Sequence, residues 1–167
     1  MRSRRLNKAP NREEHGVGYD AAESIFLGKR MFTVLFDTRQ KVMLTRYTGV
    51  LSSDDIAALD EYVRGFVAGE GFYVRSIFDL TGVEVFAISR PKLLLRGRKL
   101  RINPGQDRVF VAPQHEIHEL YRDYAQAQLD LGNGKMMVVE RFDEALRLLE
   151  LHDPNFQPLT RRTSLEV

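Results

Sequence analysis

The sequence contains no cysteine. This absence excludes disulfides, thiolate nucleophiles and cysteine-based zinc or iron–sulfur sites, so a metal site would depend on the four histidines and on carboxylates. The chain also lacks any run of about 18 apolar residues, and we therefore expect no transmembrane helix. Its arginine-rich start leads into polar residues instead of an apolar segment, which argues against a secretory signal and favours a soluble cytoplasmic protein.

The sequence also has no large excess of positive or negative charge. Lys and Arg number 25 against 23 Asp and Glu, which gives a formal net charge of +2, so composition provides no support for nucleic-acid binding. The length of 167 residues and the hydrophobic content of 43% suit one α/β domain with a single core. We expect a disordered basic arm over residues 1–24, the domain over residues 25–152 and a flexible tail over residues 153–167.

Catalytic and cofactor-binding motifs are also absent. The sequence has no phosphate-binding loop of either glycine-rich type, and no serine lies in a GxSxG context. His115 and His118 lack a third ligand partner, which favours two solvated residues on a first helical turn over a metal site. Asp79 and Glu84 could form a carboxylate pair for acid–base chemistry, but no nucleophile accompanies them, and capping of a turn by Asp79 is the simpler interpretation. We therefore expect no catalytic residue, metal or cofactor, and no enzyme activity.

The hydrophobic pattern predicts a mixed α/β fold. Alternation over residues 31–37 and a β-rich pattern over residues 42–50 predict a hairpin, and this antiparallel opening excludes a purely parallel strand order. Helical periodicity then alternates with short apolar runs, and the expected elements are a helix from about 52 to Gly69 or Gly71, a strand over 72–80 closed by a turn at Thr81 and Gly82, a helix over 90–101, a strand over 108–112, a helix from about 115 to 132, a strand over 135–141 and a helix capped by Asp143. The fold class expected is a mostly parallel five-stranded sheet flanked by helices, in the order β-β-α-β-α-β-α-β-α.

The predicted helix over residues 90–101 is unusually basic. It contains no acidic residue, and its basic face is expected either to be solvated or to contact an acidic partner or an anionic membrane surface. The side chains expected to face the core are Leu93, Leu94, Leu95, Leu100 and Ile102, with Gly97 as a weak point. The cations proposed for binding are Arg90, Lys92, Arg96, Arg98, Lys99 and Arg101.

Ser89 precedes this helix and is the expected N-cap. The alternative role is phosphorylation, which would add a charge of about −2 beside a helix N-terminus and several cations.

Short motifs indicate a family resemblance. The order of elements over residues 31–151, the segment FDLTGV at 78–83, NPG at 103–105, RVFVA at 108–112 and FDEAL at 142–146 resemble the STAS domain, in its SpoIIAA-like branch, which is related to CRAL-TRIO lipid-binding domains. The resemblance implies a non-enzymatic regulatory module. In anti-sigma-factor antagonists it also implies a phosphorylated serine in an Asp-Ser-Ser-Gly motif, which falls here on residues 87–90 and retains only Ser89.

Two functions follow as hypotheses. The leading one is a protein-interaction module whose contact surface lies around the helix over residues 90–101, with no nucleic acid as partner and with homo-oligomer formation left open. The alternative is a binder of a lipid-like small molecule or an anionic membrane surface, with the same helix as a lid. A cavity beneath this helix would favour a small-molecule ligand, whereas a space filled by its leucines would not.

Overall fold

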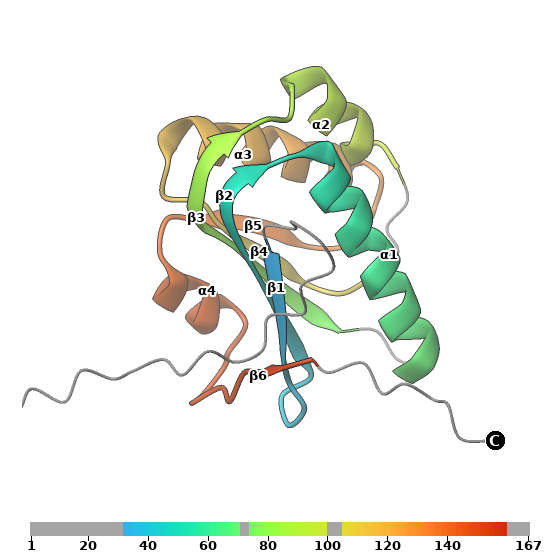
Figure 1. Cartoon of the computed structure of the whole chain (residues 1–167), viewed down its shortest axis with the longest axis vertical. Helices are drawn as coiled ribbons and strands as arrows, with labels where there is room; N and C mark the ends of the chain where they lie inside the picture. The colour runs from blue at the N-terminus through green and yellow to red at the C-terminus, as the bar shows by residue number, and fades with distance from the viewer. Residues whose placement is uncertain (1–31, 71–73, 100–104, 160–167) are drawn as a thin grey trace, which may run out of the picture.

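The computed structural model describes residues 32–70, 74–99 and 105–159 (Figure 1). The arm expected over residues 1–24 lies outside these ranges, as do Leu100, Arg101 and Ile102. None of the helices within the described ranges is long and apolar enough to cross a membrane.

The centre of the fold is a six-stranded mixed sheet with the strand order β5-β4-β3-β2-β1-β6. Strand β1 pairs antiparallel with both β2 and β6, whereas β2, β3, β4 and β5 run parallel to their neighbours. The predicted hairpin and the mostly parallel sheet are therefore confirmed, with one short strand more than expected. The strands are β1 Phe32–Asp37, β2 Val42–Leu51, β3 Arg75–Phe86, β4 Arg108–Val111, β5 Met136–Val139 and β6 Gln157–Pro158.

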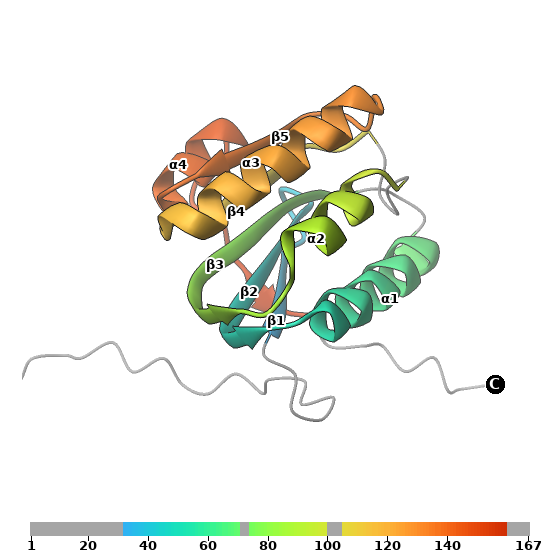
Figure 2. The ribbon, with the colours of Figure 1, turned by 90° about the horizontal axis from the view of Figure 1, so that it is seen from above.

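In the described part of the chain, four helices cover the two faces of this sheet unequally. They are α1 Ser53–Glu70, α2 Arg90–Gly97, α3 His115–Asp130 and α4 Phe142–Leu148. Figure 2 shows α2 lying between α1 and α3. Successive strand residues point to opposite faces, so Tyr47 and Phe110 pack with α1, α2 and α3, while Ile77 and Val109 pack with Ala145 of α4.

The prediction of a turn at Thr81 and Gly82 is wrong. Strand β3 continues through both residues to Phe86 and follows β2 in parallel, with register shifts in the pairing. A Cβ atom added at Gly82 would lie 2.8 Å from the Tyr47 carbonyl oxygen. This glycine therefore permits a close approach of two strands and does not mark a turn.

Two predicted helix ends also differ from the structure. Helix α2 ends at Gly97 instead of 101, because the N–H groups of Arg98 and Lys99 bond back to carbonyls three residues earlier and close the helix. The N-cap position of α4 is Arg141, and Asp143 lies within the first turn. A carboxylate there is still favourable, because it faces the positive end of the helix dipole.

Part of the segment expected as a flexible tail is paired with the domain. Residues 157–158 form β6, and the Tyr62 hydroxyl donates to the carbonyl of Leu159. The buried Asp37 carboxylate accepts from the N–H groups of Gln40 at 2.8 Å and Asn155 at 2.7 Å. These bonds join the segment to the β1–β2 turn, while residues 160–167 lie outside the described ranges.

Candidate binding site around α2

Helix α2 packs closely on α3. Gly97 is buried, and a Cβ atom added there would lie 3.1 Å from the Tyr124 ring and 3.2 Å from the Ala127 Cβ. The glycine that was expected to be a weak point of the helix therefore allows α2 and α3 to pack closely. At the other end, Ser89 occupies the N-cap position with an extended backbone, but its side chain makes no capping hydrogen bond and is exposed.

Two buried amides of the α3 region hold the carboxyl end of α2. The Gln128 side-chain amide donates to the carbonyls of Gly97 and Lys99, the latter at 3.1 Å. The Asn133 amide donates to the Lys99 carbonyl and to the Gln128 side-chain oxygen, both at 3.4 Å. Carbonyls at a helix end lack partners within the helix, so this clamp satisfies them and fixes the position of α2.

In the structure, two of the cations predicted for the basic face of α2 form ion pairs with neighbouring helices. Arg96 forms a bidentate ion pair with Asp60 of α1, with both N–O distances at 2.5 Å, and Arg90 pairs with Asp123 of α3. Burial lowers the pKa of the Arg96 guanidinium, but its hydrogen bonds and charge interaction with Asp60 raise that pKa further, and the net shift is upward. The acids that balance α2 therefore come from neighbouring helices.

The outer face of α2, defined here as Lys92, Leu95 and Arg98, is open to solvent. Leu95 is 61% exposed, so the expectation that it faces the core is wrong, whereas Leu93 is 1% exposed and fits it. The physical reason is the helical repeat: two residues on from Leu93 the side chain has rotated by about 200°. Within the described ranges, neither Lys92 nor Arg98 forms an ion pair.

A cavity of about 270 Å³ lies beneath the inner side of α2, between α1, α3 and the sheet. The leucines of α2 therefore do not fill this space. Its lining combines aromatic rings with charged groups, in which one carboxylate faces four cations. The main contributors are Tyr47, Asp60, Arg64, Phe78, Leu93, Arg96, Lys99, Arg108, Phe110, Tyr121, Tyr124 and Gln128.

Three tyrosines of this lining are almost completely buried. Tyr47, Tyr121 and Tyr124 are 4%, 3% and 5% exposed. Burial raises the pKa of Tyr47 and Tyr121, so both hydroxyls stay protonated. None of the three hydroxyls makes a hydrogen bond to another described residue, and Arg96 lies within electrostatic reach of Tyr47 and Tyr124.

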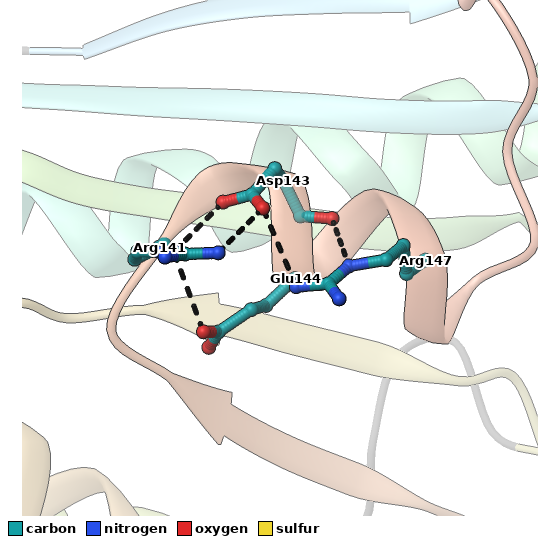
Figure 3. A network of polar contacts seen from close by, with 4 residues as sticks. All are labelled: Arg141, Asp143, Glu144 and Arg147. Atoms are coloured by element: carbon teal, nitrogen blue, oxygen red, sulfur yellow. Dashed lines mark hydrogen bonds and ion pairs between the residues drawn. The ribbon is translucent and has the colours of Figure 1, made fainter.

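The polar network at the start of α4 is a separate surface feature. Arg141 contacts both Asp143, at 2.7 Å, and Glu144, at 3.4 Å, and Arg147 reaches Asp143 at 3.3 Å (Figure 3). The hydrogen bond and charge of Arg141 lower the pKa of Asp143. Two cations balance two carboxylates on an exposed surface, so the network has no excess charge for a ligand.

The remaining predicted site residues lie apart from the cavity. Asp79 accepts a hydrogen bond from the Thr81 N–H at 3.0 Å and forms an ion pair with Arg46 at 3.6 Å, not a pair with Glu84. The His118 ring nitrogen Nδ1 lies 3.2 Å from the Ala112 carbonyl oxygen. Across the described part of the chain, no three His, Asp or Glu side chains are grouped as metal ligands.

Sequence reasoning missed several residues that build the site. Asp60 and Asp123 lie 36 and 33 residues from their arginine partners, a separation at which no periodic pattern links two side chains. Tyr121 and Tyr124 did carry a signal, because their spacing of three places them on one helix face. That spacing indicates a buried face and says nothing of a cavity.

Comparisons with known proteins give a likeness of fold. No family model and no curated protein matches the chain. A solved structure that is similar is described as an uncharacterized protein of the DUF3478 family with a SpoIIAA-like fold from Shewanella loihica PV-4. It is 13% identical, with a TM-score of 0.45, over 74% of this chain and 98% of that chain. The description of that protein gives no activity.

Proposed function

We propose that the protein is a non-enzymatic interaction module that binds an acidic protein partner through the outer face of α2. The observation that carries this proposal is Leu95, which is 61% exposed and lies between Lys92 and Arg98. Neither cation forms an ion pair within the described ranges, although Arg98 lines a surface pocket together with Asp123 and Asp130. An exposed leucine between two cations without ion pairs matches a partner surface that offers an apolar pocket with carboxylates around it.

The attachment of α2 to α3 supports the same proposal. Gln128 holds the carboxyl end of the helix, and Arg90 joins its first turn to Asp123. A helix fixed in this way loses little conformational entropy when a partner binds, so more of the contact energy appears as affinity. The non-enzymatic part is supported by Asp79, whose carboxylate is engaged by Arg46 and by the Thr81 N–H.

A membrane surface is less favoured than a protein as the binding partner of the outer face of α2. Cations near an anionic membrane contribute about 1 kcal/mol each, and the outer face of α2 offers two with a single leucine. The lid movement in the alternative hypothesis would also have to break the Arg96–Asp60 pair and the Gln128 clamp. Flotation with vesicles containing anionic lipid tests this alternative, and co-flotation at low salt that is lost in Lys92→Glu/Arg98→Glu would favour the membrane over the protein partner.

Site-specific photo-crosslinking tests the proposal. A photoreactive amino acid replaces Leu95 in cells of the source organism, and adducts are identified by mass spectrometry. We expect a defined adduct with a protein that has an acidic surface, and its loss when Lys92 and Arg98 are both changed to glutamate. Leu148 of α4, which is 43% exposed and lies beyond the opposite face of the sheet, is the matched control position. The same adducts from both positions would contradict the proposal.

A further inference from the structure

Aromatic side chains line the cavity beneath α2. The rings of Phe78 and Phe110 are stacked with centroids 4.7 Å apart and an interplanar angle of 14°. Phe110 also stacks on Tyr121, with centroids 4.4 Å apart, and Tyr124 meets it edge-on. Phe78 and Tyr121 therefore cover the faces of Phe110, which leaves its ring edge for the cavity. An aromatic ligand body can place its face against such an edge, which is one of the favourable geometries of aromatic pairs.

The same cavity has more hydrogen-bond donors than acceptors. A guanidinium has five N–H donors, and the described residues use only two of those on Arg96, both toward Asp60. The hydroxyls of Tyr47, Tyr121 and Tyr124 have no partner within the same ranges, although each side chain is more than nine-tenths buried. The hydroxyl oxygens are not fully enclosed atoms, so they can donate hydrogen bonds to an acceptor inside the cavity.

Charge points to the same kind of ligand. Arg64, Arg96, Lys99 and Arg108 line the cavity, and Asp60 is the one carboxylate among its lining residues. Arg64 also contacts the exposed Glu61, which reduces its contribution. Asp60 balances Arg96, and Arg108 has an interaction of its own, so Lys99 is the cation that contributes the excess positive charge. Electrostatic attraction is stronger where water is partly excluded. An anionic group in the cavity would therefore be stabilised.

We propose that this cavity binds a compact organic anion with a planar unsaturated body, of the chemistry of an aryl carboxylate. The carboxylate lies at Arg96 and the tyrosine hydroxyls, and the planar body packs against Leu93 and the edge of the Phe110 ring. The volume of about 270 Å³ lies below the range of about 300–1,000 Å³ of sites for drug-sized ligands, which favours a compact molecule over a long acyl chain. This inference is independent of the partner surface, because the site lies on the other side of α2.

Isothermal titration calorimetry with four probes tests the proposal on the wild-type chain. The probes are 2-naphthoate, its neutral counterpart 2-naphthamide, acetate and inorganic phosphate. Hydrogen bonds to a charged group contribute enough for about a tenfold difference in Kd or more. We therefore expect 2-naphthoate to bind at least about tenfold more tightly than each of the other three. Equal affinity for the acid and the amide, or no binding of 2-naphthoate at millimolar concentration, would overturn the proposal.

Tyrosine-to-phenylalanine variants locate the bound carboxylate. Tyr121→Phe and Tyr124→Phe remove one hydroxyl each and keep the ring, and we expect each to raise the Kd of 2-naphthoate by about three- to tenfold. Tyr62→Phe is the matched control, because the Tyr62 hydroxyl donates to Leu159 and this residue does not line the cavity. Unfolding curves confirm that each variant is folded. Unchanged Kd values in both cavity variants would show that these hydroxyls contact only water and would refute the assigned position.

Discussion

Replacing Gln128 with leucine removes the polar clamp that fixes α2 on α3. Gln128 is 1% exposed, and its amide donates to the carbonyls of Gly97 and Lys99. Leucine fills a similar volume, so the change deletes hydrogen bonds without opening a large cavity. Asn133 also loses the Gln128 oxygen as an acceptor.

The expected loss of stability follows from these contacts. Each of the two hydrogen bonds contributes about 1 kcal/mol net, and a buried carbonyl left without a donor costs about 1–3 kcal/mol. The free energy of unfolding should therefore fall by about 2–4 kcal/mol. For a domain of this size, a loss of about 3 kcal/mol corresponds to a decrease in Tm of about 6–12 °C.

Urea unfolding followed by circular dichroism measures the change, and hydrogen exchange locates it. We expect faster amide exchange in α2 while the central strands β2 and β3 remain protected. Gln126→Leu is the matched control, because Gln126 is exposed on the other side of the same helix, and surface substitutions usually change stability by less than about 0.5 kcal/mol. Similar stability of Gln128→Leu and the control would refute the clamp.

Three further changes probe other parts of the structure. Burial raises the pKa of Asp37, but hydrogen bonds from Gln40, Asn155 and Arg39 lower it overall. Asp37→Asn should therefore cost about 2 kcal/mol in urea unfolding at neutral pH, and this difference should persist above about pH 4 and disappear as pH falls through the lowered pKa. Gly82→Ala should lower the free energy of unfolding by about 1–3 kcal/mol, because the new methyl group meets the Tyr47 carbonyl. Gly65→Ala, which has open space in the middle of α1, should raise it by up to about 1 kcal/mol. Equal thermal unfolding midpoints of the two variants would contradict both predictions. Ser89→Asp should weaken binding of an acidic partner about twofold to tenfold in a calorimetric titration, with Ser89→Ala as control.

The sheet could be predicted from the sequence because its signals are local. Period-two alternation and short apolar runs identified β1 to β5, and acidic residues after Ser52 placed the start of α1. Strand β6 was missed because two residues next to a proline carry no periodic signal; they form a strand only through pairing with β1. The predicted end of β3 was misplaced because glycine is typical of turns, whereas Gly82 lies within the strand and allows β2 to approach closely.

The candidate site was only partly predictable. The basic composition of α2 is visible in the sequence, but which cations face outward depends on where the helix lies. Arg96 and Arg90 turn toward Asp60 and Asp123 on two different helices, and a one-dimensional pattern does not contain these contacts. The cavity arises from the spacing of three helices above the sheet, which depends on packing distances rather than on any motif.

The most direct test of the account is the affinity for the protein captured at position 95. We expect the Kd of this partner to rise at least about tenfold in Lys92→Glu/Arg98→Glu, because two attractive charge pairs become repulsive, and to rise with salt in the wild-type protein. An unchanged Kd in the double variant, with α2 still folded, would contradict the claim that the outer face of α2 is the contact surface.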